Sequence, residues 1–353
     1  MGSLGWNLLS QLGFWQQLGT VPASSPAPGP ALSLRVITHN IRYAATDLFE
    51  GERPWSERAP LVLSQLQHEV RHVVPAVPVT DNLANAVSPS PTGGGALICL
   101  QEVLHTQLVD VMAGLNGVPN GGKKAEPAGG PVWKHIGVGR DDGKRKGEYS
   151  PIIYPVQHFE LLHHETVWLS PTPDKPSKGW DAGSIRLLTV AVLEHRGTRR
   201  RVLAASTHLD NAGSESRRES VAIILRTLRR VHAKWEAAAG GNETLGIVLA
   251  GDFNSFTTQE AYVAMREDGY LRDLHDEVAP TARYGDIITF TGFGPDQDKD
   301  EQGRIDFVWL GPATNGDEKS IWKPEGYAVL PNLFEAGTYL SDHRAVVGDV
   351  MLL

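Results

Sequence analysis

Polar residues suited to metal binding and to acid–base chemistry follow apolar segments at six places in the chain. The six places are His39-Asn40, Gln101-Glu102, Thr207-His208-Leu209-Asp210, Asp252-Phe253-Asn254, Arg304-Ile305-Asp306 and Ser341-Asp342-His343. A single carboxylate after a strand is more often a turn or helix-capping residue than a catalyst. Six such ends gathered at one sheet edge would instead form an acidic cleft whose members shift one another's pKa values.

Carboxylates, amides and histidines without cysteines favour a hard divalent cation. Mg²⁺ binds carboxylate and carbonyl oxygens together with water, and a substrate phosphate usually completes its shell. Hydrolysis of a phosphoester is the reaction that suits this set of side chains. The sequence has no GxSxG nucleophile motif and no GxxxxGK[ST] phosphate-binding loop. It therefore predicts metal-dependent hydrolysis rather than acyl-enzyme chemistry or P-loop nucleotide binding.

Strands must position these residues, and the hydrophobic pattern predicts them. The continuous apolar runs 96–100 and 245–251 are typical of strands covered on both faces, and residues 32–41 form a third strand before Asn40. Segments 186–195 and 201–207 predict a hairpin that ends at His208. Other strands are expected at 133–138, 150–154, 159–168, 287–291, 304–310 and 345–351, and helices at 54–73, 106–115 and 216–236.

Composition and order of elements predict an α/β fold in which two sheets pack together with helices outside. The chain has 353 residues, 41% of them hydrophobic, which is enough for a substantial core. We expect a leader and Pro/Ser-rich linker at 1–31, followed by a single domain at 32–353. The single cysteine, Cys99, excludes an internal disulfide.

A formal net charge of -8 disfavours a polyanionic partner unless a local basic groove exists. No apolar run reaches the length of about 20 residues that spans a bilayer. The first 34 residues lack the charged start and clean apolar core of a signal peptide. The compartment stays open, with the cytoplasm slightly favoured, and no sequence feature predicts an oligomeric state.

The ordered set Asn40, Glu102, Thr207-His208, Gly251-Asp252-Phe253-Asn254, Asp306 and Ser341-Asp342-His343 resembles the endonuclease/exonuclease/phosphatase superfamily. The resemblance runs from about residue 35 to the C-terminus. It implies a four-layered α/β/β/α sandwich of two mixed sheets with the active site at one end. It also implies phosphoesterase activity that depends on Mg²⁺, with Mn²⁺ as an alternative. Motifs at 139–152 and 178–181 are similar to an uncharacterised bacterial and fungal branch.

The resemblance also implies a role for each matched residue. Glu102 would be the principal metal ligand, with Asn40 beside it and Asp342 at a second metal position. Asp252 would position or deprotonate the attacking water, and Asn254 would orient it. His343 would contact a phosphate oxygen, with its ring oriented by Asp306, while His208 would stabilise charge in the transition state.

Substrate specificity is expected on the loops. Arg140 and Arg186 are candidates for binding a phosphate or diphosphate, and Tyr149 and Trp180 for stacking on a base or sugar. Each also has a structural alternative, such as an internal salt-bridged turn at Arg140 or a core position for Trp180. Glu148 is a further candidate, as a partner of His208.

Three functions are consistent with these features. The favoured one is hydrolysis of a phosphodiester or phosphomonoester of a small molecule, such as a phosphorylated sugar, inositol or lipid headgroup. The alternative is a nuclease or deadenylase of the same fold, which would need a cationic track for several phosphates. The third, a binding module without activity, conflicts with the intact set of catalytic residue types.

Overall fold

The computed structural model describes residues 30–71, 73, 94–117, 132–238, 245–294, 301–314, 319–334 and 337–353. Most of the leader and linker expected at 1–31 lies outside these residues. No helix in the described segments is long and apolar enough to cross a membrane.

Two mixed sheets form the centre of the molecule. The first has the strand order β10-β12-β15-β1-β2-β4-β3. Its members are β1 (Leu32–Asn40), β2 (Gly95–Gln101), β3 (Trp133–Ile136), β4 (Ile152–Pro155), β10 (Arg283–Gly285), β12 (Trp322–Val329) and β15 (Val346–Leu352). The second has the order β5-β6-β7-β8-β11-β9. Its members are β5 (Phe159–Trp168), β6 (Leu187–His195), β7 (Arg201–His208), β8 (Gly246–Asp252), β9 (Arg272–Asp273) and β11 (Asp306–Gly311).

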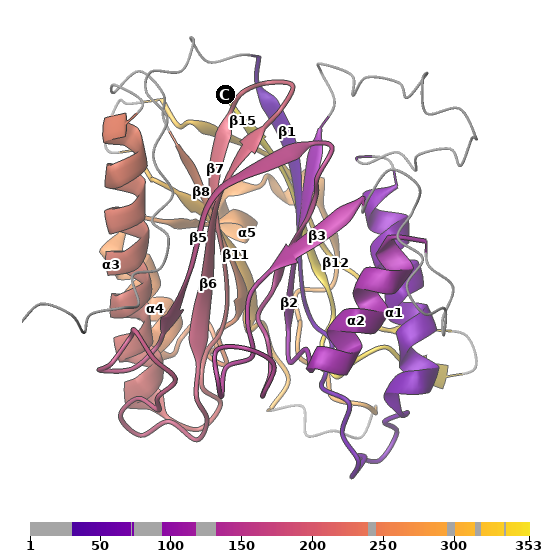
Figure 1. Ribbon diagram of the computed structural model, residues 1–353. Helices are drawn as coiled ribbons and strands as arrows, with labels where there is room; N and C mark the ends of the chain where they lie inside the picture. Colours follow the sequence, from indigo (N-terminus) through magenta and orange to yellow (C-terminus); the bar gives the residue numbers. More distant parts are fainter. Residues whose placement is uncertain are drawn as a thin grey trace, which may run out of the picture.

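Helices cover the outer face of each sheet (Figure 1). Helices α1 (Trp55–Val70) and α2 (His105–Leu115) pack on the first sheet, and α3 (Ser214–Ala238) and α4 (Glu260–Asp268) pack on the second. The short elements α5 (Leu274–Glu277), the 3-10 turn Pro280–Ala282, β13 (Leu333–Phe334) and β14 (Thr338–Tyr339) lie in the connections. This arrangement is the expected α/β/β/α sandwich.

Successive side chains of a central strand point to opposite faces of its sheet, and this alternation explains the layers. In β2, Leu97 and Cys99 point into the core between the sheets, whereas Ile98 and Leu100 point toward α1 and α2. In β8, Val248 faces the other sheet and Leu249 faces the helices. Because apolar side chains cover both faces, these strands appear in the sequence as uninterrupted apolar runs.

Most of the expected elements are confirmed, including the β6–β7 hairpin and the strands before Asn40, Gln101 and Asp252. The strand expected at 287–291 is wrong, because this segment makes only isolated bridges at Phe290. The Asp286 carboxylate accepts hydrogen bonds from the backbone N–H groups of Ile287 and Ile288, which keeps them from strand pairing.

Strand β12 and helix α4 were not expected. Pro324 and Gly326 interrupt β12 at a register shift, which hides its pattern.

Candidate active site

Strand register brings the polar ends of the second sheet into one row. Asp252, the last residue of β8, pairs with His208 at the end of β7 on one side. On its other side it pairs with Asp306 at the start of β11. In the first sheet, Asn40 at the end of β1 pairs with Gln101, directly before Glu102. Residues separated by more than two hundred positions therefore meet at one end of the sandwich.

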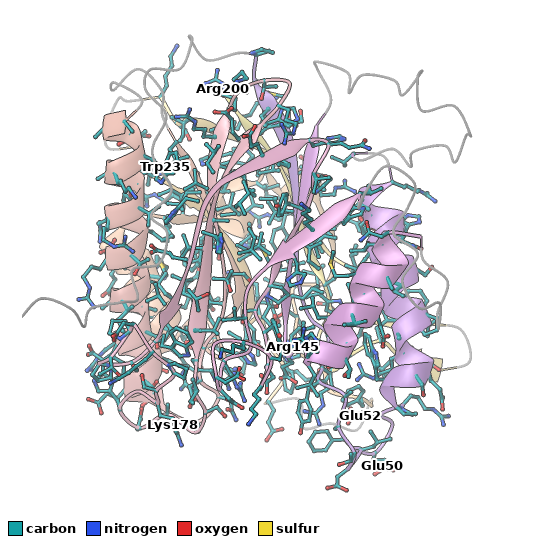
Figure 2. All side chains as sticks on the ribbon, in the orientation of Figure 1. Glu50, Glu52, Arg145, Lys178, Arg200 and Trp235 are labelled. Atoms are coloured by element: carbon teal, nitrogen blue, oxygen red, sulfur yellow. The ribbon has the colours of Figure 1, made fainter. Side chains whose placement is uncertain are left out.

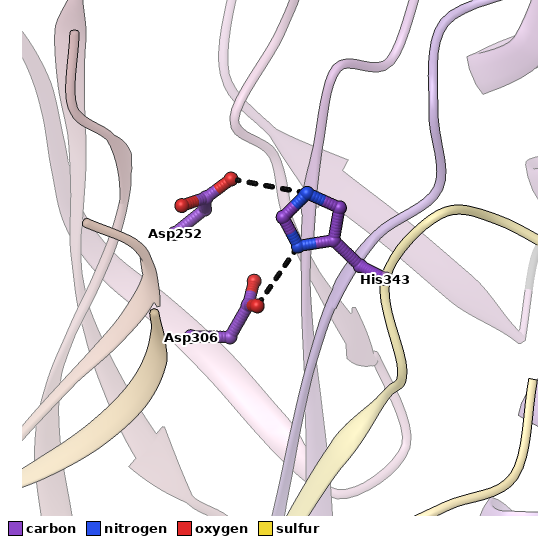
Figure 3. A group of neighbouring side chains, drawn as sticks. All are labelled: Asp252, Asp306 and His343. Atoms are coloured by element: carbon purple, nitrogen blue, oxygen red, sulfur yellow. Dashed lines mark hydrogen bonds and ion pairs between the residues drawn. The ribbon is translucent and has the colours of Figure 1, made fainter. Parts of the chain in front are cut away.

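Hydrogen bonds between the sheets close this site. The Asn40 amide donates to Glu102 Oε1 at 3.1 Å and to Asp252 Oδ2 at 3.0 Å. His343, in the loop before β15, contacts Asp306 Oδ2 through Nδ1 at 2.9 Å (Figure 3). The structure thus brings together the predicted residues Asn40, Glu102, His208, Asp252, Asn254, Asp306, Asp342 and His343.

Asp252 lies between the two histidines. Its Oδ2 is 3.7 Å from His343 Nε2 and 3.5 Å from His208 Nε2. Burial, together with the nearby Asp306 charge, raises the pKa of Asp252 to about 7, against the opposing effect of His343. A carboxyl whose pKa lies near neutrality is suited to proton transfer.

His343 is held in its charged form. Burial alone would lower its pKa, but the charges of Asp306 and Asp252 outweigh burial and raise the pKa to about 10. Asp306 is fully buried and its Oδ2 faces the ring, so it also fixes the ring orientation. His343 can therefore present an imidazolium to an anionic group.

His208 is neutral. Burial, followed by the charges of Arg186 and Arg140, lowers its pKa well below the ordinary value. The Asn254 amide nitrogen lies 2.9 Å from His208 Nε2 and donates to the Leu209 carbonyl at 3.0 Å. The Asn254 amide nitrogen can only donate, so His208 Nε2 accepts its hydrogen bond. The proton of the neutral ring therefore lies on Nδ1, which faces Glu148 Oε2 at 3.7 Å.

The donor set around Asn40 fits a hard cation. Glu102, Asp252 and Asp342 supply carboxylate oxygens at this end of the sheets, as Mg²⁺ prefers. Burial raises the pKa values of Asp252 and Asp342, so negative charge is crowded where little solvent reaches it. A divalent cation would offset this crowding. Arg42 provides part of the compensation, since its Nη1 lies 3.8 Å from Glu102 Oε2.

Asp252, Asp306 and His343 form a second grouping with metal-ligand chemistry. One ligand-type atom of each lies within 4.8 Å of the others. Without a metal, burial would lower the pKa of His343, but the charges of Asp306 and Asp252 raise it to about 10, so both ring nitrogens carry protons in the metal-free protein. Asp252 belongs to both groupings, because its Oδ2 also accepts a hydrogen bond from the Asn40 amide at 3.0 Å.

Backbone geometry at the site is unusual. Glu102 has a φ of 59° and Asn254 a φ of 45°, in the left-handed region that side chains other than glycine rarely adopt. Just before Asp252, Gly251 has a φ of 153°, and a Cβ there would lie 2.0 Å from the Thr207 carbonyl oxygen. Only glycine allows β7 and β8 to approach this closely beside His208.

Sequence reasoning missed a buried arginine that joins two loops of the site. Arg58 of α1 is fully buried and donates to the carbonyls of Ile41 at 2.7 Å and Leu340 at 2.8 Å, and it also bonds the Arg42 carbonyl. It thereby ties the segment after Asn40 to the segment before Asp342. A lone arginine on an amphipathic helix carries no sequence signal for such a role.

Two of the four substrate-binding candidates lie beside the core of the site. Arg140 and Arg186 both approach Glu148 Oε2, at 2.7 and 3.9 Å. Tyr149 is only 3% exposed and its hydroxyl donates to the Lys144 carbonyl, so it supports the loop instead of presenting a stacking face. Trp180 is 39% exposed, and in the described residues no hydrogen bond, ion pair or ring contact joins it to the catalytic set.

Other conspicuous sequence features lie away from this site. Arg200 directly precedes β7, whereas the active-site residue His208 ends that strand. In Figure 2, Arg200 is accordingly at the opposite end of the molecule from Lys178. An HExxH spacing begins at His68, near the end of α1. Its Glu69 pairs with Arg35 near the start of β1, and its second histidine lies outside the described residues.

No protein-family model matches the chain, and no curated protein matches its sequence. Solved structures do. An endonuclease/exonuclease/phosphatase from Bacteroides vulgatus is 27% identical, with a TM-score of 0.69 over 91% of this chain and 99% of that one. A mannosyl-6-phosphatase from Bacteroides thetaiotaomicron is 26% identical, with a TM-score of 0.68 over 90% and 99%.

More distant structures share the fold alone. D. rerio TDP2 complexed with a single-strand DNA product is 15% identical, with a TM-score of 0.55 over 90% of this chain and 98% of that one. The four-layered sandwich, the meeting of the ordered residues at one end and the Bacteroides structures lead to the same conclusion. In fold and in the residues gathered at this end, the chain is similar to endonuclease/exonuclease/phosphatase proteins, among them a phosphatase that acts on a phosphoester bond.

Proposed function

We propose that the protein is a divalent-metal-dependent phosphoesterase that hydrolyses a phosphate ester of a small molecule, with a phosphorylated sugar as the first choice. The observation that carries this proposal is the placement of Asp252. Its Oδ2 accepts a hydrogen bond from the Asn40 amide and faces the Nε2 atoms of His208 and His343. This arrangement surrounds one proton acceptor with groups able to hold a phosphoryl group and a water.

Each residue then has a task in in-line hydrolysis. Asp252 accepts a proton from the attacking water, and Asn254, whose amide nitrogen is held by His208 Nε2 and the Leu209 carbonyl, orients that water through its amide oxygen. The His343 imidazolium donates a hydrogen bond to a phosphoryl oxygen, where negative charge grows in the transition state. Asp306 keeps His343 charged and oriented. Because His208 is neutral and its Nε2 accepts from the Asn254 amide, it holds Asn254 in place and adds no full charge.

Glu102 and Asp342, with Asn40 beside them, would hold Mg²⁺ or Mn²⁺. A bound divalent ion supplies Lewis-acid stabilisation of the phosphoryl oxygens and of the leaving group. The Asn40 amide oxygen already accepts from the Arg42 backbone N–H at 3.0 Å, and its nitrogen bridges two carboxylates. Asn40 therefore mainly holds the Glu102 and Asp252 carboxylates at a fixed separation.

Two observations support a small substrate over nucleic acid. The sugar phosphatase is among the structures with more than a quarter of residues identical, whereas TDP2 with bound DNA resembles the chain in fold alone. The arginines of α3 lie on the outer helical layer, where Arg229 pairs with Asp268 and Arg230 with Glu165. They do not line the site at the ends of the sheets.

The test measures turnover of p-nitrophenyl phosphate, bis-p-nitrophenyl phosphate, hexose 6-phosphates and single-stranded oligonucleotides with Mg²⁺, Mn²⁺ or EDTA. We expect metal-dependent hydrolysis of a small ester, abolished by EDTA. Asp252→Ala should lower kcat by about 10³-fold or more, because the proton acceptor is lost. The matched control, Asp268→Ala on α4, should leave turnover unchanged.

The same experiment separates the alternatives. Cleavage of oligonucleotides with a steep salt dependence, and none of the small esters, would favour the nuclease. Full activity in EDTA would contradict metal dependence. If a folded Asp252→Ala protein kept wild-type turnover, the assignment of the site itself would be wrong.

A further inference from the structure

Glu148 lies between two arginines and next to His208. Its Oε2 accepts a hydrogen bond from Arg140 Nη1 at 2.7 Å and lies 3.9 Å from Arg186 Nη1 and 3.7 Å from His208 Nδ1. The Glu148 and Arg140 side chains remain 15% and 16% exposed. They form a polar face one side chain away from the groups assigned to the phosphoryl transfer.

The two guanidinium charges of this face are already compensated by carboxylates. Besides Glu148, Arg186 Nε pairs with the buried Asp210 at 3.3 Å, and Arg140 Nε lies 3.8 Å from Asp141. Every guanidinium therefore already has a carboxylate. A second phosphate would find no surplus positive charge here, in contrast to the arginine clusters that bind phosphate groups. This argues against the diphosphate suggested by the sequence.

Hydrogen-bonding capacity nevertheless remains. In the described residues, Arg140 Nε, Arg186 Nη1 and His208 Nδ1 are buried nitrogens without a hydrogen-bond partner. A buried N–H group without a partner lowers the stability of the fold unless a ligand or a water accepts its hydrogen bond. A carboxylate beside a guanidinium offers an acceptor and a donor together, which is the complement of a hydroxyl group.

The loop that carries this face is held rigidly. Trp168 Nε1 donates to the Arg140 carbonyl at 2.9 Å, and the Arg140 N–H donates to the Glu148 carbonyl at 3.1 Å. At Gly139 a Cβ would lie 2.3 Å from the Lys146 carbonyl oxygen, so the loop can close only with glycine there. A rigid polar face loses little entropy on binding and discriminates well.

We propose that Glu148 and Arg140 form a specificity subsite for neighbouring hydroxyl groups of an uncharged polyol, such as a sugar ring, attached to the scissile phosphate. The proposal rests on the function proposed above and names its substrate class. Glu148 accepts from one hydroxyl, Arg140 donates to the oxygen of the next, and Arg186 and Asp210 hold the arrangement in place.

The experiment compares kcat/KM for mannose 6-phosphate, 2-deoxyglucose 6-phosphate, fructose 1,6-bisphosphate, glycerol 3-phosphate and p-nitrophenyl phosphate in the Mg²⁺-loaded protein. The variants are Glu148→Gln, Arg140→Lys and, as the control, Asp141→Asn. Asp141→Asn removes the same charge from a side chain that is 49% exposed and only 3.8 Å from Arg140. Arg140→Lys keeps the charge and carries the test if Glu148→Gln does not fold.

We expect the wild type to prefer a polyol phosphate over p-nitrophenyl phosphate, and to gain nothing from the second phosphate of the bisphosphate. Glu148→Gln and Arg140→Lys should reduce that preference by about 10- to 100-fold, mainly through KM. Asp141→Asn should retain it. In either variant, kcat/KM should fall less for 2-deoxyglucose 6-phosphate, which has one hydroxyl group fewer, than for mannose 6-phosphate.

Two results would overturn the subsite. An equal loss on every ester would reduce Glu148 and Arg140 to structural support, and a preference for the bisphosphate would make the face an anion site. Hydrolysis of p-nitrophenyl phosphate without preference for any polyol ester would refute the subsite while the proposed function stands. Absence of turnover on all esters would refute the proposed function and the subsite with it.

Discussion

The two histidines on either side of Asp252 have similar positions and opposite environments. Each presents Nε2 to Asp252 Oδ2, and each has a carboxylate on the Nδ1 side, Asp306 for His343 and Glu148 for His208. Asp306 is fully buried, and within the described residues its only ion pair is with His343. Glu148 is shared with two arginines.

This difference sets the protonation states. An uncompensated carboxylate raises the pKa of His343 to about 10, whereas burial beside two guanidinium groups lowers that of His208 well below its ordinary value. Groups whose environments push their pKa values apart are suited to separate tasks. The same residue type thus provides a cation on one side and a neutral ring on the other.

Asp306→Asn should have the largest effect, because it removes the carboxylate that distinguishes His343 from His208. Without the carboxylate His343 loses its charge and its fixed orientation, so we expect kcat to fall by about 10³-fold, with a smaller effect on KM. Steady-state kinetics on p-nitrophenyl phosphate measures this, with thermal unfolding as the check on folding. A loss of less than about tenfold in a folded protein would contradict the assigned role.

The comparison can be measured directly in the metal-free protein. We expect ¹⁵N NMR of the imidazole rings in EDTA to show His343 charged at pH 7.5, and to lose that charge only near pH 10. His208 should be neutral at the same pH, with its proton on Nδ1. Two rings that titrate together near pH 6.5 would remove the distinction.

A smaller effect is expected from Asp210→Asn on the His208 side. Burial would raise the pKa of Asp210, but hydrogen bonds from Gly183, Gly213 and Ser184, with the Arg186 charge, lower it to about 2. The pKa in the unfolded chain is about 3.9, so the stabilisation is present above pH 4 and disappears as pH falls toward 2.

For Asp210→Asn we therefore expect the free energy of unfolding at pH 7 to fall by about 2 kcal/mol. Urea denaturation measures it at pH 7 and at pH 3, and the difference from the wild type should shrink at the lower pH. A difference that is independent of pH would show that the charge of Asp210 is unimportant.

The smallest change is Tyr149→Phe, which removes the hydrogen bond from the hydroxyl to the Lys144 carbonyl at 2.8 Å. We expect a loss of about 1 kcal/mol in stability and only a few-fold rise in KM, because the loop keeps its backbone hydrogen bonds. A large fall in kcat would instead give Tyr149 a direct part in the reaction.

Much of this site could be predicted from the chain because strands end where their apolar pattern ends. The runs before Asn40, Glu102 and Asp252 placed these residues at strand ends, and the order of the polar residues indicated the fold. Arg58 escaped because its partners are backbone carbonyls, which leave no sequence pattern. The segment 287–291 was misassigned because the competing hydrogen bonds of Asp286 are local side-chain chemistry.

The sequence by itself determined the layers, the strands and the residue types available for chemistry, since these follow from periodic burial along the chain. Only the tertiary structure decided which groups face each other. The charge of an imidazole or a guanidinium depends on the distance to its partners and on shielding from water, and neither is encoded locally. Hence the sequence could name Arg140, Arg186 and the two histidines, but the folded arrangement shows that the arginines are already neutralised and that the histidines differ.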